Sequence, residues 1–188
     1  PATGPAAVPS QQQAGRRMSR KIGLGMITVA WLMLFLMAGI AIEEWLQQRQ
    51  NPNRQPDSFV GESGERRVIL RANRAHQYLS RAQINGHTVT LLVDTGATDV
   101  VLPETLAQRL QLPVGASAYA ITANGRVRIQ RTTLEEIRLG SIVLRHVKAS
   151  INPGMADDTP VLLGMSALSA IELRQQNGEL HLIQRPES

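Results

Sequence analysis

The sequence contains no cysteine, which excludes disulfides, thiolate metal sites and cysteine nucleophiles. Aromatic residues are also scarce, with two Phe, two Tyr and two Trp among 188 residues. The formal net charge is +5, but no basic run is interleaved with aromatic side chains that could stack on bases. Nucleic-acid binding is therefore not expected, and the basic residues are interpreted as a solvated surface.

Signals for metal or cofactor chemistry are equally absent. The four histidines show no spacing typical of metal ligands, and each is expected to be a surface or strand residue. Ser166 lacks the flanking glycine of a nucleophile elbow. We therefore expect neither a metal nor an organic cofactor. The histidines are His76, His87, His146 and His181.

A long apolar run divides the chain near its N-terminus. Residues 1–21 are rich in Pro, Ala, Gln and Ser and predict a disordered cytoplasmic tail. Residues 22–42 contain no charged residue and are long enough to form a transmembrane helix. Basic residues precede this run, and Glu43 and Glu44 follow it. This pattern predicts a single span in a bacterial inner membrane, with the N-terminus cytoplasmic and the C-terminal domain periplasmic.

A cleaved signal peptide is the competing interpretation of the same run. Its apolar region would normally be shorter, about 7–15 residues. The small residues at 39–41 could nevertheless serve as a cleavage site. The membrane anchor is favoured, and both alternatives stay open.

The polar segment 43–65 predicts a flexible linker, and residues 66–188 are the part expected to fold independently. Short apolar runs, separated by turn signals at intervals of about 8–12 residues, predict an all-β domain, a small closed barrel. Asn-Gly pairs at 85–86, 124–125 and 177–178 each predict a hairpin turn. Two short helices are expected at 103–110 and 165–170.

The most informative segment reads Leu91-Leu92-Val93-Asp94-Thr95-Gly96-Ala97-Thr98. An apolar strand runs directly into an acid and then into a tight turn with glycine. A carboxylate at the end of a buried strand is costly unless it has partners. Either Asp94 caps the turn, which is a common structural role, or it takes part in chemistry.

This segment resembles the active-site signature of the retropepsin-like aspartic peptidases, in which two apolar residues precede Asp-Thr/Ser-Gly-Ala. The family's second hallmark is an apolar-apolar-Gly segment, and Val161-Leu162-Leu163-Gly164 matches it, with Gly164 lying 70 residues after Asp94. Between the two hallmarks the family places a hairpin flap, and residues 121–127 occupy that place. The resemblance covers residues 66–188 and is closest to the bacterial, single-span membrane-anchored members.

The resemblance implies a role for each matching residue. Asp94 would be catalytic, and Thr95 would hydrogen-bond across a dimer beneath it. Leu163 and Gly164 would support the active-site loop from behind. Retroviral members usually carry Asp where this chain has Thr98, and Thr98 cannot supply that charge. The details of substrate binding in retroviral members are therefore not expected to apply to this chain. The active-site loop would also include Gly96 and Ala97, and the substrate would contact Gly96, Thr98, Asp99, Thr122, Ala123, Asn124 and Gly125.

Aspartic peptidases need two carboxylates that share one proton and activate a water molecule. The chain has only one matching motif, and Asp99 is too near Asp94 to be the partner. Asp57, Asp157 and Asp158 lie in no matching context. The second carboxylate would therefore come from another copy. The sequence thus predicts a homodimeric aspartic endopeptidase acting on exported or membrane-proximal proteins, or on its own linker.

Two other functions are compatible with the sequence. The first is a catalytically silent module of the same fold, acting in periplasmic binding or assembly; the presence of Asp94 argues against it. The second is a phosphate-binding turn of a sugar-kinase or actin-type ATPase. That architecture needs two large lobes, which residues 66–188 are too few to build.

Overall fold

The computed structural model describes residues 29–40, 42, 51–122 and 125–186. The chain divides into two compact units, Pro1–Leu46 and Gln47–Ser188. In the first unit, residues 29–40 and residue 42 are helical. The other positions of the predicted span, and the whole predicted tail, lie outside the described residues. Within the part of the chain that is described, no helix is both long enough and apolar enough to cross a membrane.

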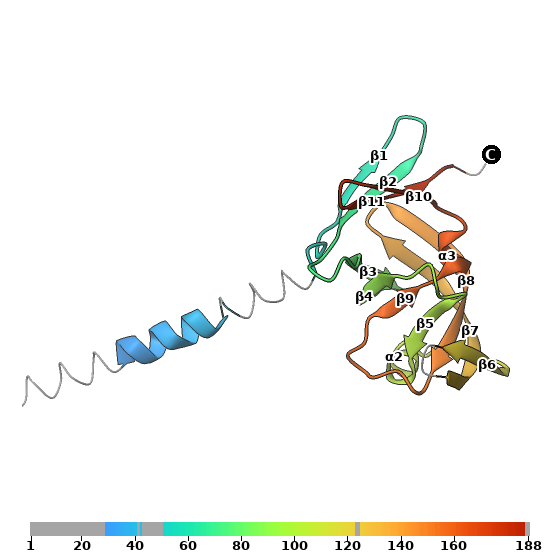
Figure 1. The fold of residues 1–188 in the computed structure, drawn as a ribbon, viewed down its shortest axis with the longest axis horizontal. Coiled ribbons are helices and arrows are strands. Elements are labelled where there is room, and N and C mark those ends of the chain that lie inside the picture. The colour runs from blue at the N-terminus through green and yellow to red at the C-terminus, as the bar shows by residue number, and fades with distance from the viewer. Residues whose placement is uncertain (1–28, 41, 43–50, 123–124, 187–188) are drawn as a thin grey trace, which may run out of the picture. The chain divides into compact units, whose positions relative to one another are not determined.

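The second unit is built mostly from strands, as predicted, with few short helices (Figure 1). Its larger sheet has the strand order β3-β4-β9-β5-β8-β7-β6. An additional pairing of β3 with β7 closes six of these strands into a ring and leaves β6 outside it. The strands are β3 (Leu79–Ile84), β4 (His87–Val93), β5 (Val100–Pro103), β6 (Ser117–Thr122), β7 (Gly125–Leu139), β8 (Ile142–Asn152) and β9 (Val161–Leu163).

A second sheet of four strands has the order β1-β2-β11-β10. Successive side chains of a strand point to opposite faces, and here one face is apolar and buried. Val68, Leu70 and Leu182 on that face are all 0% exposed, so this sheet shares the core of the domain. The strands are β1 (Asp57–Val60), β2 (Arg66–Arg71), β10 (Glu172–Gln176) and β11 (Glu179–Gln184).

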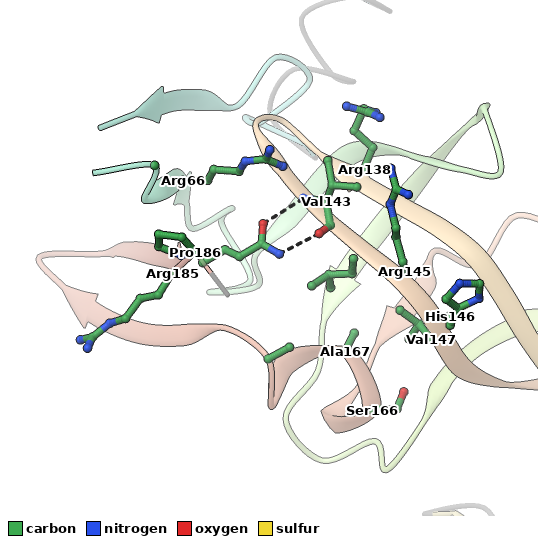
Figure 2. Close-up of a pocket in the computed structure, with 14 residues that line it drawn as sticks. Arg66, Arg138, Val143, Arg145, His146, Val147, Ser166, Ala167, Arg185 and Pro186 are labelled. Carbon is green, nitrogen blue, oxygen red and sulfur yellow. Dashed lines mark hydrogen bonds between the residues drawn. The ribbon is translucent and has the colours of Figure 1, made fainter. Parts of the chain in front are cut away.

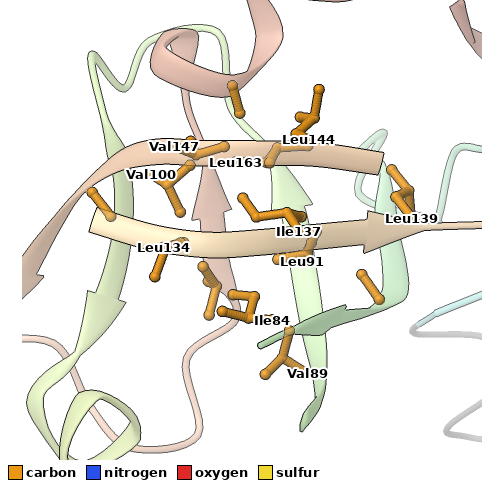
Figure 3. Close-up of a cluster of buried hydrophobic side chains, with 14 of the residues drawn as sticks. Ile84, Val89, Leu91, Val100, Leu134, Ile137, Leu139, Leu144, Val147 and Leu163 are labelled. Atoms are coloured by element: carbon orange, nitrogen blue, oxygen red, sulfur yellow. The ribbon is translucent and has the colours of Figure 1, made fainter. Parts of the chain in front are cut away.

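The core lies inside the ring of strands (Figure 3). Leu91 from β4, Ile137 from β7 and Leu163 from β9 are each 1% exposed. β4 and β9 run parallel, and Val93 is paired with Leu163 at their ends. Because the carboxyl ends of parallel neighbours meet at the same edge of a sheet, the residues that follow, Asp94 and Gly164, emerge side by side.

The Asn-Gly pairs form the predicted hairpin turns wherever they are described. Asn85 and Gly86 have φ of 49° and 81°, and Asn177 and Gly178 have φ of 52° and 79°. Two consecutive positive φ angles are typical of a type I′ turn, and asparagine and glycine tolerate them best. Asn124 lies outside the described residues.

Both predicted helices are present but shorter than expected. α2 spans Glu104–Arg109 and α3 spans Met165–Leu168. Pro103, predicted to begin the first helix, is the last residue of β5 and the N-cap of α2. Its φ of −64° and ψ of 151° are extended rather than helical. Proline fixes φ but leaves ψ free, so its presence alone could not place the boundary.

The folded unit begins before residue 66, inside the segment predicted as a linker. β1 pairs with β2, and Asn53 is 3% exposed. The Asn53 amide donates to the carbonyl oxygens of Arg71 at 2.9 Å and Leu79 at 2.6 Å. These contacts join residues far apart in sequence, so the polar composition of the segment does not reveal them. β7 likewise runs without a break over 15 residues, from Gly125 to Leu139.

Candidate active site

Asp94 follows directly after β4 and begins a tight turn. Its Oδ1 accepts a hydrogen bond from the Gly96 N–H at 2.9 Å, and its carbonyl oxygen accepts one from the Ala97 N–H at 3.2 Å. Among the described residues, the Asp94 carboxylate makes no other hydrogen bond or ion pair, and the residue is partly exposed. One carboxylate oxygen is therefore held by the loop while the other is free to meet a water molecule or a second acid.

Gly96 makes this arrangement sterically possible. A β-carbon at this position would lie 3.2 Å from the Asp94 Oδ1, tighter than ordinary van der Waals contact. Thr95, Gly96 and Thr98 are exposed, and Ala97 is partly exposed. The loop thus presents its surface outward, with the carboxylate at its start.

The residues after β9 hold the Asp94 loop from behind. The Asp94 N–H donates to the Leu163 carbonyl at 3.2 Å, and the Met165 N–H donates to the Ala97 carbonyl at 2.8 Å. The Ser166 N–H donates to the Thr98 carbonyl at 2.9 Å. Three backbone hydrogen bonds therefore fasten the loop, one to the end of β9 and two to the start of α3.

Gly164 is in close contact with the same loop. A β-carbon at residue 164 would lie 2.7 Å from the Ala97 carbonyl oxygen and would overlap the carbonyl oxygen of Asp99. Only glycine allows the two backbones to approach this closely. Leu163 and Gly164 thus both contact the loop that begins with Asp94.

Two serines that the sequence analysis did not assign to this site stabilise it. The Ser166 hydroxyl donates to the Lys148 carbonyl at 2.7 Å and accepts from the Val100 N–H at 3.0 Å. The Ser150 hydroxyl, in a residue only 2% exposed, donates to the Asp99 Oδ2 at 2.9 Å. Each of these hydrogen bonds joins residues at least 18 positions apart in the sequence. No local sequence signal could therefore have identified the role of the two serines.

No second carboxylate joins Asp94 within the described part of this chain. Asp99 directs its carboxylate to Ser150. Asp157 accepts a hydrogen bond from the Thr105 hydroxyl at 2.8 Å, and Asp57 forms an ion pair with Arg71 at 3.3 Å. Each of these acids has a partner elsewhere, which leaves Asp94 as a single acid at the end of β4.

The predicted flap is a hairpin formed by β6 and the beginning of β7. Thr122 is paired with Gly125 at its end, and Ala123 and Asn124 lie outside the described residues. Ile121 is 93% exposed. The Arg126 guanidinium lies 4.0 Å from the centre of the Tyr119 ring, which is a cation–π contact. The hairpin thus carries exposed apolar surface that a bound ligand could cover.

Within the described part of the chain, Asp94 belongs to no metal-binding cluster and lines neither of two hollows on the domain. Among the described residues, no three His, Asp or Glu side chains gather closely enough to hold a metal ion. A hollow of about 790 Å³ lies instead against β8, α3 and the end of β11. None of the predicted site residues lines it. A site that needs two copies would have its substrate-binding surface completed by the second copy.

Comparison with known proteins supports a retropepsin-like family and fold. The sequence model of the family described as "gag-polyprotein putative aspartyl protease" matches residues 80–170. The crystal structure of a retropepsin-like aspartic protease from Rickettsia conorii superposes with a TM-score of 0.53 at 28% sequence identity. That superposition covers 62% of this chain and 98% of the other. The matched range contains Asp94, the hairpin and Gly164.

Two curated relatives have no described function. An uncharacterized protein from the cobV 5′ region of a Sinorhizobium species is 32% identical over 124 residues, which is 63% of this chain and 52% of the relative. The uncharacterized protein RP867 from Rickettsia prowazekii (strain Madrid E) is 31% identical over 104 residues, or 54% and 43% of the two chains. The chain therefore spans about half the length of the curated relatives it matches.

Proposed function

We propose that this chain is an aspartic endopeptidase whose active site forms when two copies bring their Asp94 carboxylates together. The Asp94 loop is the observation that carries the proposal. It holds one carboxylate oxygen through the Gly96 N–H at 2.9 Å and leaves the other without a partner among the described residues. A retropepsin-like fold, which suggests aspartic peptidase activity, surrounds this loop.

The chemistry requires two carboxylates close enough to share one proton. Like charges at that distance repel strongly, so the reactive form of the pair has one carboxyl group protonated and the other ionised. The ionised member takes a proton from a water molecule, which attacks the scissile carbonyl carbon. The protonated member donates to the carbonyl oxygen. Because the two acids titrate as a unit, neither role belongs permanently to one copy.

The second acid would come from a homodimer with a two-fold axis between the Asp94 loops. Two observations support this arrangement. One oxygen of the Asp94 carboxylate has no partner among the described residues, and the carboxylates of Asp57, Asp99 and Asp157 are each bonded to another residue. The hairpin bearing Ile121 would close over an extended peptide and exclude water from the reaction. Extended peptides suit such a site because their backbone groups can pair with strand-like neighbours.

The apolar run and its charged flanks support membrane attachment with the catalytic domain outside the cytoplasm. Substrates would then be exported or membrane-proximal proteins. Self-cleavage in the linker at residues 46–65 is disfavoured where the segment contains β1 and the buried Asn53. This location and this substrate class rest on the sequence pattern.

The central experiment measures cleavage of a diverse peptide mixture by the full chain in an uncharged detergent, between about pH 4 and 7. Asp94→Asn and Asp94→Ala are expected to abolish cleavage. Asp57→Asn makes the same chemical change at an exposed acid and is expected to keep full activity. Cleavage that survives both Asp94 variants would exclude this mechanism. A wild-type chain that dimerises without cleaving any peptide would favour a silent binding or assembly module.

A mixing experiment tests whether two copies share one site. Wild type and Asp94→Asn are combined at constant total protein concentration and allowed to exchange subunits. If both copies contribute Asp94, an equal mixture retains about one quarter of the wild-type activity, as expected for random pairing in a two-fold dimer. Activity at one half of the wild-type value would show that each copy acts alone.

A further inference from the structure

The hollow beside β8 is built around an irregularity in that strand. His146 has a φ of 52°, in the left-handed region that residues other than glycine adopt only uncommonly. Leu134 pairs with Val147 and Glu136 pairs with Arg145, so the regular pairing is interrupted at His146. The register is the same on both sides of this gap, so one residue of each strand, Glu135 and His146, is left out of the pairing.

The interrupted pairing changes which side chains of β8 face outward. Leu144 and Val147 are both buried, whereas Arg145 and His146 between them are both exposed. In a regular strand, neighbouring side chains would point to opposite faces. The strained conformation therefore places two consecutive basic side chains on one side of the strand, where both line the hollow (Figure 2).

Further arginines reach the same hollow from other strands. Arg66 from β2 and Arg138 from β7 line it, while Arg185 lines it near the C-terminal end of β11. Arg185 is directed to Glu172, at 2.8 Å, and its guanidinium points away from the other arginines in Figure 2. Arg66, Arg138 and Arg145 are therefore the arginines considered below.

The charges of these three arginines are not balanced. Glu136 pairs with Arg138 at 2.8 Å and with Arg145 at 3.8 Å. In the described part of the chain, Arg66 forms no ion pair, and no Asp or Glu lines the hollow. Three guanidinium groups are thus accompanied by one carboxylate, which leaves a local excess of two positive charges.

The geometry of the hollow is fixed before any ligand arrives. The Gln184 side-chain amide donates to the Val143 carbonyl at 2.7 Å, and its oxygen accepts from the Val143 N–H at 3.1 Å. Gln184 is paired with Arg66 across β11 and β2, and Val143 is paired with Arg138 across β8 and β7. This double hydrogen bond joins β11, the neighbour of β2, to β8.

We propose that this hollow is a binding site for a phosphate group, either as free phosphate or on a small phosphorylated molecule such as a lipid headgroup. Guanidinium groups arriving from three strands suit a tetrahedral, doubly charged anion better than a flat, singly charged carboxylate. Strain held in an element beside a cavity is a feature of functional sites. None of the residues involved belongs to the Asp94 site, so the proposal does not depend on peptidase activity.

The test is calorimetric titration of the full chain in an uncharged maltoside detergent. Inorganic phosphate and sn-glycerol 3-phosphate are the probes, and acetate at matched ionic strength is the reference anion. Saturable binding of either phosphate probe, at least about tenfold tighter than acetate, is expected. Binding of both probes indicates that phosphate alone is recognised, and binding of glycerol 3-phosphate alone indicates a headgroup.

Variants assign the binding to this hollow. Arg145→Gln is expected to weaken phosphate binding by about tenfold. The double variant Arg66→Gln/Arg145→Gln is expected to weaken it by more than tenfold. Arg109→Gln removes the same charge from the exposed end of α2 and is expected to bind as wild type. Circular dichroism checks that each variant is folded. Equal binding of phosphate and acetate, or wild-type binding by a folded double variant, would overturn the proposal.

Discussion

The backbone of Gly164 lies so close to Asp99 that a β-carbon at residue 164 would overlap the Asp99 carbonyl oxygen. The residues that follow β9 are thereby packed directly against the loop that begins with Asp94. Three backbone hydrogen bonds maintain the contact. The position of the candidate catalytic acid therefore depends on a glycine 70 residues further along the chain.

Gly164→Ala is expected to lower the free energy of unfolding by about 3 kcal/mol, because the buried backbone would have to move apart. Chemical denaturation of wild type and variant measures the difference. Gly61→Ala is the matched control, since a β-carbon there would meet nothing closer than 3.7 Å. A Gly164→Ala protein as stable as the control would contradict the packing described here.

Ser166→Ala is expected to destabilise the domain by about 1–3 kcal/mol. The change removes the acceptor of the Val100 N–H, and Val100 is 0% exposed. A buried donor without a partner loses its hydration without compensation. Ser169→Ala, at an exposed position just after α3, should change stability by less than about 0.5 kcal/mol. Equal effects of the two changes would show that the Ser166 hydroxyl contributes little.

Ile121→Asn is expected to lower kcat/KM for peptide cleavage by about tenfold without changing stability. Ile121 is 93% exposed, so the folded domain has little packing to lose. Under the proposed function, its side chain becomes buried when the hairpin closes on substrate, and burial of such a side chain contributes about 1.5 kcal/mol or more. Val60→Asn, at a position 65% exposed on β1, serves as control. Unchanged kinetics for Ile121→Asn would remove the hairpin from substrate binding.

Glu172 is expected to titrate below the ordinary range of a glutamate. The hydrogen bond from the Arg174 side chain makes the largest contribution to lowering the pKa of the Glu172 carboxyl group, and the hydrogen bond from Arg185 makes the next largest. The pKa of Glu172 is lower in the folded protein than in the unfolded chain, so its ionised carboxylate stabilises the folded state at pH values above the unfolded pKa. This stabilisation is lost as the pH falls through the folded pKa. Carbon-detected NMR titration should show the Glu172 midpoint rising toward 4.5, the ordinary value of a glutamate side chain, in Arg185→Gln.

Arg71→Gln is the control for that titration, because Arg71 pairs with Asp57 and Glu179 rather than Glu172. It should leave the Glu172 midpoint unchanged. A wild-type midpoint already in the ordinary glutamate range would show that the two arginines do not stabilise the ionised form in solution.

Local sequence patterns were sufficient wherever the physical cause is local. Asn-Gly predicts a type I′ turn because these two residues accept positive φ, and both described pairs adopt it. Short apolar runs between turn signals predict strands because strand side chains alternate between faces, and in β4 the buried Val89 and Leu91 alternate with exposed residues. The motif around Asp94 also indicated an acid at the end of a buried strand.

Contacts between distant residues required the tertiary structure. β1 and Asn53 lie in a segment whose composition resembles a linker, and their folded state depends on pairing with β2 and on hydrogen bonds to Arg71 and Leu79. The interrupted pairing at His146 is likewise set by β7, not by the local sequence.

The sequence by itself determined the mostly β character of the domain, its turns and the candidate acid, because backbone preference and side-chain periodicity act over a few residues. Only the tertiary structure decided that the Asp99 carboxylate is directed to Ser150 and that Ser166 joins β8 to β5. It also decided that Arg66, Arg138 and Arg145 line one hollow. These features depend on which strands become neighbours, and that is fixed by the packing of the whole core.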